Sequence, residues 1–424
     1  MQFAETEKLV DHLFRHEAGK MVAVLSRLFG LHNLQLAEDV VQDAFIKAQQ
    51  SWKFNNLPDD PSAWLMQVAK NRAIDIIRRQ NNFNLYSKEL AAELNEQSAC
   101  TLDQFFHELE IADSQLRMMF ACCHPSLKQE DQVALTLKTV SGFSMQEIAR
   151  SLVTNETAIQ KRLHRAKEFL KNNQIQLEIP AGEELKKRLE TIYTVLYLLF
   201  NEGYNSLKAD ELIRKDLCAE AMRCCKLLGE HKAGDQPSTF ALLSLMCFQA
   251  SRFDSRIDDN NDIILLQQQD RKKWNKELIN IGFHYLNKCS KGDELSVYHI
   301  ESAIAAQHCF AETFAATNWE KLLQLYDMLL EVNPSPAVQL NRAVVLAQLG
   351  AIEAAIQSIL SITGIDKLLR TDHIYSSVLG ELYKRLSDTI KANEYLQQAF
   401  DLTPSTAEKK LIKTKMEELL KNRN

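Results

Sequence analysis

The side chains best suited to binding chemistry lie between Gly142 and Leu170, in the sequence GFSMQEIARSLVTNETAIQKRLHRAKEFL. Cationic and amide side chains recur there on the helix face opposite an apolar stripe. A helix that exposes such groups can enter the major groove of duplex DNA, where lysine and arginine contact phosphate or guanine and glutamine contacts adenine. The candidate DNA contacts on this face are Thr157, Gln160, Lys161, Arg162, His164 and Arg165.

Two short helices joined by a tight turn are predicted to position these residues. Ser144 and Glu147 form an S-x-x-E capping box, which predicts a helix beginning at Met145, and Asn155 can cap the second helix. The predicted core stripe of the second helix is Ile159, Leu163, Ala166 and Leu170. The alternative is an ordinary helical hairpin with a solvated basic face; the caps, the short turn and the charge placement together favour DNA binding.

A second polar face is predicted on a helix over residues 63–80. Amides and arginines on one helix face suit unstacked single-stranded DNA, because amides read base edges and cations hold phosphates. The opposing interpretation is that Trp64 belongs to the core and that Asp75 pairs with an arginine of the same helix; for Trp64 we favour the core. The candidate residues are Asn71, Arg72, Asp75, Arg78 and Arg79, and the preceding polar loop, residues 53–62, holds one aromatic residue, Phe54, and two asparagines, Asn55 and Asn56.

A third candidate surface lies on the helix predicted to end at Trp52. Val41, Ala44 and Phe45 belong to its buried side, whereas Ile46 lies among acidic and amide groups on the other. An exposed isoleucine there indicates a protein-docking surface, although the pattern taken alone slightly favours an ordinary solvated face. The candidate docking residues are Asp39, Gln42, Asp43 and Ile46.

The composition limits the classes of protein that the chain can belong to. It has 424 residues, enough for two or three domains, and its scarcity of glycine (12) and proline (8) favours an all-α fold. The net charge of −6 argues against indiscriminate coating of nucleic acid. Nine cysteines without framework spacing, and no signal peptide or membrane-spanning run, predict reduced thiols in the cytoplasm.

No motif indicates an enzyme. We find no phosphate-binding loop and no nucleophile with a neighbouring base, so no catalytic residue or cofactor is predicted. Cys122, Cys123 and His124 are potential metal ligands, but adjacent residues on a helix point about 100° apart and no further ligand pair follows. A packed helix end stopped by Pro125 is the favoured interpretation, and no metal site is predicted.

The segments AEDVVQDAF, WLMQVAKNRAIDIIRR and GFSMQEIARSL followed by AIQKRLHRAK resemble bacterial sigma factors of the extracytoplasmic-function (ECF) group. The resemblance implies that Asp39, Gln42 and Asp43 belong to a helix that binds the core of bacterial RNA polymerase. It further implies that the helix of Asn71 melts and reads the −10 element of promoter DNA, and that the loop of Phe54 holds a flipped base. The helix of Lys161, Arg162 and Arg165 would read the −35 element, although Ala158-Ile159 stand where the family often has Thr-Val, with Thr157 one position earlier.

The resemblance also implies a domain order: sigma region 2 over residues 1–80, a linker over 81–112 and the helix-turn-helix of region 4 over 113–175. The patch MFACCHPSL and the NEGY element of Leu189–Ser206 resemble an ECF subgroup with a large C-terminal helical extension, here residues 180–424. Gly203 is the predicted end of the Leu189–Ser206 helix.

Internal repetition near the C-terminus indicates tetratricopeptide (TPR)-like repeats over about residues 303–406. Stacked helix pairs of this kind leave a concave surface that usually binds protein, so a protein partner is predicted there. The residues at signature positions are Phe310, Leu322, Tyr326, Pro334, Ala343, Ala355, Leu379, Gly380, Tyr383, Ala392, Ala399 and Pro404.

Three classes of function remain open. The leading one is an ECF sigma factor whose TPR-like domain regulates its activity or contacts proteins. A helix-turn-helix activator or repressor with a TPR-like sensor domain would need the DNA module but not the Asp39 and Asn71 helices. A helical scaffold without DNA function leaves the basic faces unexplained.

Overall fold

The computed structural model describes residues 2–54, 57–83, 106–152, 154–205, 213–258, 262–291 and 295–421 of the protein. Regular structure in these ranges is helical, and extended pairing is limited to one isolated antiparallel bridge between Ile257 and Ile263. The predicted all-α fold is therefore confirmed. The chain divides into two compact units, Met1–Leu199 and Phe200–Asn424, which are described separately below.

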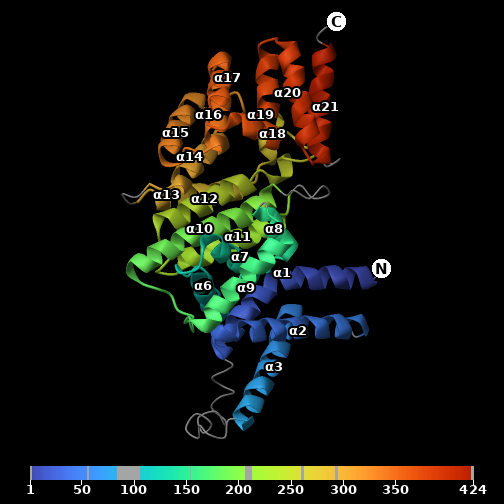
Figure 1. Cartoon of the computed structure of the whole chain (residues 1–424), viewed down its shortest axis with the longest axis vertical. Helices are drawn as coiled ribbons and strands as arrows, with labels where there is room; N and C mark the ends of the chain where they lie inside the picture. The colour runs from blue at the N-terminus through green and yellow to red at the C-terminus, as the bar shows by residue number, and fades with distance from the viewer. Residues whose placement is uncertain are drawn as a thin grey trace. The chain divides into compact units, whose positions relative to one another are not determined.

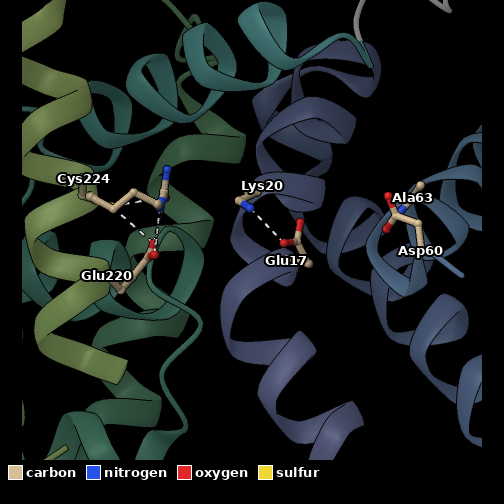
Figure 2. Close-up of polar contacts among 7 residues, drawn as sticks. Glu17, Lys20, Asp60, Ala63, Glu220 and Cys224 are labelled. Atoms are coloured by element: carbon tan, nitrogen blue, oxygen red, sulfur yellow. Dashed lines mark hydrogen bonds and ion pairs between the residues drawn. The ribbon is translucent and has the colours of Figure 1, made fainter. Parts of the chain in front are cut away.

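The first unit begins with three long helices and a short 3-10 turn. They are α1 (Gln2–Phe29), η1 (Leu31–Asn33), α2 (Leu34–Phe54) and α3 (Pro61–Phe83). Gly30 makes the sharp turn after α1 with φ of +82°, a conformation that favours glycine. The predicted loop over 53–62 is shorter than expected, because the Asp60 carboxylate accepts a hydrogen bond of 2.9 Å from the Ala63 backbone and caps a helix that begins at Pro61 (Figure 2).

Four further helices form the second half of this unit: α6 (Glu108–Cys122), α7 (Gln129–Thr139), α8 (Met145–Ser151) and α9 (Glu156–Asn172). The predicted capping box is confirmed, since the Ser144 backbone donates to the Glu147 carboxylate at 2.9 Å and the Glu147 backbone donates to the Ser144 hydroxyl at 3.2 Å. Asn155 caps α9 as expected, accepting from the Ala158 backbone at 2.9 Å. The predicted core stripe of α9 is buried throughout.

Helix α10 (Gly182–Tyr204) ends one residue after Gly203, within the predicted NEGY element. Gly203 also permits a close approach by α11 (Lys215–Glu230). A Cβ at Gly203 would lie 2.6 Å from the Cys218 sulfur and 2.8 Å from the Arg214 carbonyl oxygen. The glycine therefore has a packing role that the sequence did not indicate.

The second unit begins around α12 (Pro237–Ala250), whose side chains are buried on nearly every side. Helices α11, α13 (Lys276–Cys289) and α14 (Val297–Phe310) pack against it. Glu220 on α11 is buried, and its carboxylate accepts hydrogen bonds from the Arg223 guanidinium at 2.8 Å and the Cys224 thiol at 3.3 Å (Figure 2). The connection from α12 to α13 contains the 3-10 turns η2 (Phe253–Ser255), η3 (Leu266–Gln268) and η4 (Arg271–Lys273).

The rest of this unit is a series of helices stacked in antiparallel pairs (Figure 1). They are α15 (Trp319–Val332), α16 (Pro336–Gln348), α17 (Ile352–Leu360), α18 (Ile365–Thr371), α19 (His373–Arg385), α20 (Thr389–Leu402) and α21 (Thr406–Lys421). Gly380 lets α19 and α20 approach closely, since a Cβ there would lie 2.7 Å from Leu396 Cγ.

The predicted repeat positions differ in burial. Leu322, Ala343, Ala355, Leu379, Ala392 and Ala399 are buried in the stack. Phe310 is 80% exposed at the end of α14, so it fills no core position of a repeat. The assignment of this region to TPR-like repeats stays a prediction.

Candidate nucleic-acid interface

The polar face of α9 is exposed in the way its spacing predicts. Thr157, Gln160, Lys161 and His164 are exposed, whereas Ile159 and Ala166 on the other side are fully buried. The core stripe fixes the rotation of the helix about its own axis, and the Asn155 cap fixes its start. The fold therefore presents cations, an amide and a hydroxyl together on one side of a rigid helix.

The two arginines of this face are held by carboxylates at the start of α7. Arg165 donates to Asp131 at 2.7 Å, and Asp131 is buried, with only 5% of its side chain exposed. Arg162 pairs with Glu130 at 2.8 Å. The hydrogen bond that Arg165 donates to Asp131 raises the pKa of Arg165 further above its ordinary value. Both arginines are thus oriented by the protein, and a phosphate would have to share or replace these carboxylates.

Two further cations belong to this face, and sequence reasoning missed both of them. Lys138 and Lys167 line, with Gln160, Lys161 and His164, a hollow of about 410 Å³. Burial lowers the pKa of Lys138, whose ammonium donates to the Phe143 carbonyl at 3.2 Å. The position of Lys167 three residues after His164 could have identified it, whereas Lys138 reaches the face only through the packing of α7.

The start of α2 forms the other wall of that hollow. Lys167 donates to Glu38 at 2.5 Å and to the side-chain oxygen of Gln35 at 3.3 Å, and Gln35 itself lines the hollow. Arg27 on α1 similarly reaches Glu110 at 2.7 Å and Asp113 at 3.2 Å on α6. Contacts of opposite charge therefore join the two halves of the first unit.

The polar face of α3 also lies on the surface. Asn71, Asp75, Arg78 and Arg79 are exposed, and the Gln67 amide donates to the Asn71 side-chain oxygen at 2.9 Å. Trp64 is half-buried, with its ring centroid 5.3 Å from that of Trp52, which supports the interpretation that it packs rather than stacks on a base. The side chain of Phe54 and the whole of Asn55 and Asn56 lie outside the described residues.

The predicted docking surface of α2 borders the α3 face. Asp39, Gln42 and Asp43 are exposed, and Ile46 is 44% exposed. Arg72 Nε lies 3.6 Å from Asp43 Oδ2, so a residue assigned to DNA and one assigned to a protein touch each other. The two predicted surfaces are therefore adjacent and form one continuous polar region.

Cys122 and Cys123, at the end of α6, are buried structural residues. The sulfurs of Cys122 and Cys123 lie 3.2 Å and 3.6 Å from the hydroxyl oxygens of Thr139 and Thr136. Burial raises the pKa of each thiol to about 12, so both stay protonated and are poor metal ligands at neutral pH. Across the part of the chain that the structure describes, no group of three or more histidine, cysteine or acidic side chains is placed to hold a metal ion.

Family models match three parts of the chain. Residues 13–83, which include most of α1 and all of α2 and α3, match sigma-70 region 2. Residues 117–170, which include α7, α8 and most of α9, match sigma-70 region 4. Residues 188–290 match a family of unknown function, DUF6596.

Relatives of two kinds are found among known proteins. An uncharacterized protein of Rhizobium meliloti is 34% identical over 388 residues, which cover 91% of this chain and 90% of that protein. The ECF RNA polymerase sigma-E factor of Haemophilus influenzae is 26% identical over 171 residues, or 39% of this chain and 87% of that protein. The RNA polymerase sigma factor CarQ of Myxococcus xanthus is 28% identical over 172 residues, or 40% of this chain and 92% of that protein.

No solved structure matches the chain significantly. Within the described ranges, no helix is both long and apolar enough to cross a membrane. The similarity to sigma factors accounts for well under half of the chain, whereas the similarity to the Rhizobium meliloti protein covers nearly all of it.

Proposed function

Because this chain belongs to the ECF group of the sigma-70 family, we propose that it is an alternative sigma factor that binds RNA polymerase core and directs it to −35 and −10 promoter elements. A role in transcription initiation follows from the membership itself. The assignment of a partner to each surface, and of a regulatory role to the C-terminal unit, is our proposal. A cytoplasmic location fits both partners.

The observation that carries this proposal is the presence of two separate polar helix faces in one chain. The α9 face offers Gln160, Lys161 and Arg165 on a capped helix-turn-helix, which suits duplex DNA. The α3 face offers Asn71 and Arg78 on an exposed helix surface, which suits an opened strand. An ordinary activator or repressor needs only the first face, so the second favours a factor that also opens the duplex.

Polymerase binding is proposed for the exposed α2 face. Asp39, Gln42, Asp43 and Ile46 lie exposed on one helix face, and an exposed isoleucine among polar side chains suits a protein contact. Its border with α3, marked by the Arg72–Asp43 contact, would place bound polymerase next to the strand being opened.

The C-terminal unit is proposed to regulate this activity or to contact a protein partner. Its stacked helix pairs resemble TPR-like architecture in their arrangement, and stacks of this kind present long surfaces to other proteins.

Reconstituted run-off transcription tests the central proposal. The purified chain would be added to bacterial core polymerase lacking sigma, on promoters from its own genome. Transcripts that depend on the full-length chain support the proposal; sequence-specific DNA binding without transcripts would support an activator or repressor instead.

The position of α10 decides where a truncation should end. Arg188 donates to the Phe120 carbonyl at 2.9 Å, and Thr191 donates to the side-chain oxygen of Gln132 at 3.3 Å, so this part of α10 belongs to the first unit. A chain ending at Leu199 keeps these contacts, whereas one ending near Asn173 would lose them. The change in transcript level for the longer truncation gives the sign of the C-terminal unit's effect.

A further inference from the structure

The second unit contains a hollow of about 570 Å³ that no predicted function uses. Its walls come from α14, α15, α16, α19 and α21, and from Leu265, Leu266 and Gln267 of the connection before α13. The volume lies in the range of about 300–1,000 Å³ that is usual for ligand sites. The chemistry of the walls therefore decides which ligand would fit.

One wall of the hollow is a single face of α16. Asn341, Val344, Val345 and Gln348 line it, at positions three, four and seven apart, so they share one side of the helix. The side-chain amides of Asn341 and Gln348 make no hydrogen bond to another residue of the described chain. An amide offers both a donor and an acceptor, which matches the backbone of an extended peptide.

Aromatic rings and a histidine form another part of the lining. Phe314 and Trp319 have ring centroids 4.9 Å apart, and Tyr326 lies along the same hollow, so aliphatic side chains would find apolar contacts there. The buried Nδ1 of His308 has no hydrogen-bond partner among the described residues. Burial, together with the nearby Arg252 and Arg271, lowers the pKa of His308 to about 4 and keeps the ring neutral.

The charge at one end of the hollow favours an anion. Arg385 donates to the Ala347 carbonyl at 2.8 Å, and Lys415 lies 3.3 Å from Glu381. These three ionic side chains line the hollow and carry a net charge of +1. A neighbouring hollow of about 320 Å³ shares Glu381 and Lys415 and adds the ion pairs Lys384–Glu418 and Lys410–Asp262, so the added side chains bring no net charge.

The chain already binds one of its own segments between the two hollows. The Asp262 carboxylate pairs with Lys410, and the following residues Ile263–Leu266 are four aliphatic side chains that are each only half-buried. The bridge between Ile257 and Ile263, and the 2.9 Å hydrogen bond from Ile264 to the Arg256 carbonyl, hold this segment in place. The surface thus accepts an acidic residue followed by aliphatic ones, and space remains beside them.

We propose that the larger hollow binds an extended segment of a partner protein that carries aliphatic side chains and at least one aspartate or glutamate. The aliphatic side chains contact Phe314, Trp319 and Leu265, the amides of α16 pair with the peptide backbone, and the carboxylate lies near Arg385 and Lys415. This inference rests on the proposed protein partner of the C-terminal unit and specifies its chemistry.

Peptide binding to the full-length chain tests the proposal. The probes are fluorescein-labelled seven-residue peptides, each with one acidic residue and three or four Ile, Leu or Val residues in varied order. One of them copies Asp262–Gln268, and each has a matched peptide with lysine in place of the acid. Members of the acidic set should bind more tightly than their lysine counterparts, and the preference should weaken with added salt.

Variants then locate the binding. Lys415→Gln should weaken peptide binding about tenfold, as expected for loss of a charge-assisted contact, and Asn341→Ala should weaken it about threefold. Lys413→Gln is the matched control, because Lys413 is exposed on the same helix and lines neither hollow. Asn341→Ala should not disturb folding, because the Asn341 side chain has no hydrogen-bond partner in the described chain to lose. Weaker peptide binding by this variant therefore cannot be attributed to misfolding.

Either of two results would overturn the inference: no acidic peptide binds better than its lysine counterpart, or Lys415→Gln and Asn341→Ala bind as the wild-type chain does. Run-off transcription by the same preparations separates this failure from failure of the sigma-factor proposal. Intact transcription without peptide binding rejects the peptide site alone, whereas absent transcription rejects the sigma-factor proposal whatever the peptides do.

Discussion

The α9 and α3 faces have similar amide and arginine content but hold their arginines differently. On α9, Arg165 and Arg162 are paired at 2.7 Å and 2.8 Å with carboxylates of α7, and one of these carboxylates is buried. On α3, Arg78 and Arg79 are exposed, and Arg72 lies 3.6 Å from an exposed Asp43. A preorganised face suits rigid duplex DNA, whereas a loosely held one can follow a strand as it leaves the duplex.

The largest expected effect is on duplex binding by the α9 face. Lys161→Ala in the reconstituted holoenzyme should weaken binding of a −35 duplex roughly tenfold or more. The slope of the logarithm of the binding constant against the logarithm of salt concentration should also decrease in magnitude by about one, as expected for loss of one phosphate contact. Fluorescence anisotropy of a labelled duplex over a range of salt concentrations measures both quantities. Lys171→Ala is the control on the last turn of the same helix; equal effects of the two variants would reject a specific role for the face.

A smaller effect is expected at the α3 face. Asn71→Ala should leave polymerase binding unchanged but reduce opening at the −10 element several-fold. This is the size of effect expected when one or two hydrogen bonds to the DNA are lost. Permanganate footprinting detects unpaired thymines in the open complex. Gln67→Ala removes the amide that donates to Asn71 and serves as the control for altered side-chain orientation. A normal open complex with Asn71→Ala would remove this residue from the proposed site.

The difference in how the arginines are held should also appear in stability. Arg165→Ala leaves the buried Asp131 without its partner and should lower the melting temperature by a few degrees, whereas Arg78→Ala should leave it nearly unchanged. Adding Asp131→Asn to Arg165→Ala should recover much of the loss without recovering DNA binding. Equal melting temperatures for the two single variants would show that the Asp131 pair does not organise α9.

Local sequence signals predict the helix-turn-helix well, but they do not predict packing between residues that are far apart in the sequence. The caps at Ser144 and Asn155 and the α9 core stripe depend on residues within one or two turns, so spacing alone identifies them. The Arg165–Asp131 pair joins residues 34 positions apart, and nothing in the α9 sequence indicates its partner. The packing role of Gly203 is hidden for the same reason, because it depends on the approach of α11.

The smallest predicted effect is on the pH dependence of stability, and it comes from a histidine–glutamate pair in the second unit. This pair differs from the arginine pairs of α9 because histidine loses its charge near neutral pH. His373 Nε2 lies 2.8 Å from the Glu408 carboxylate, which raises the pKa of His373, and that histidine together with Thr403 lowers the pKa of Glu408 despite its burial. The histidine contribution is present below its unfolded pKa and is lost as pH rises through the raised folded pKa. The glutamate contribution is present above its unfolded pKa and is lost as pH falls through the lowered one.

The pair therefore stabilises the second unit most in mildly acidic solution, between the ordinary pKa values of glutamate and histidine. His373→Gln should lower the free energy of unfolding by about 1 kcal/mol or less near pH 5.5 and by much less near pH 8. Arginine stays charged throughout this range, so the effect of Arg165→Ala should change little with pH. Thermal unfolding of both variants at the two pH values makes the comparison, and a His373→Gln effect that is the same at both would mean that the imidazole acts through packing rather than charge.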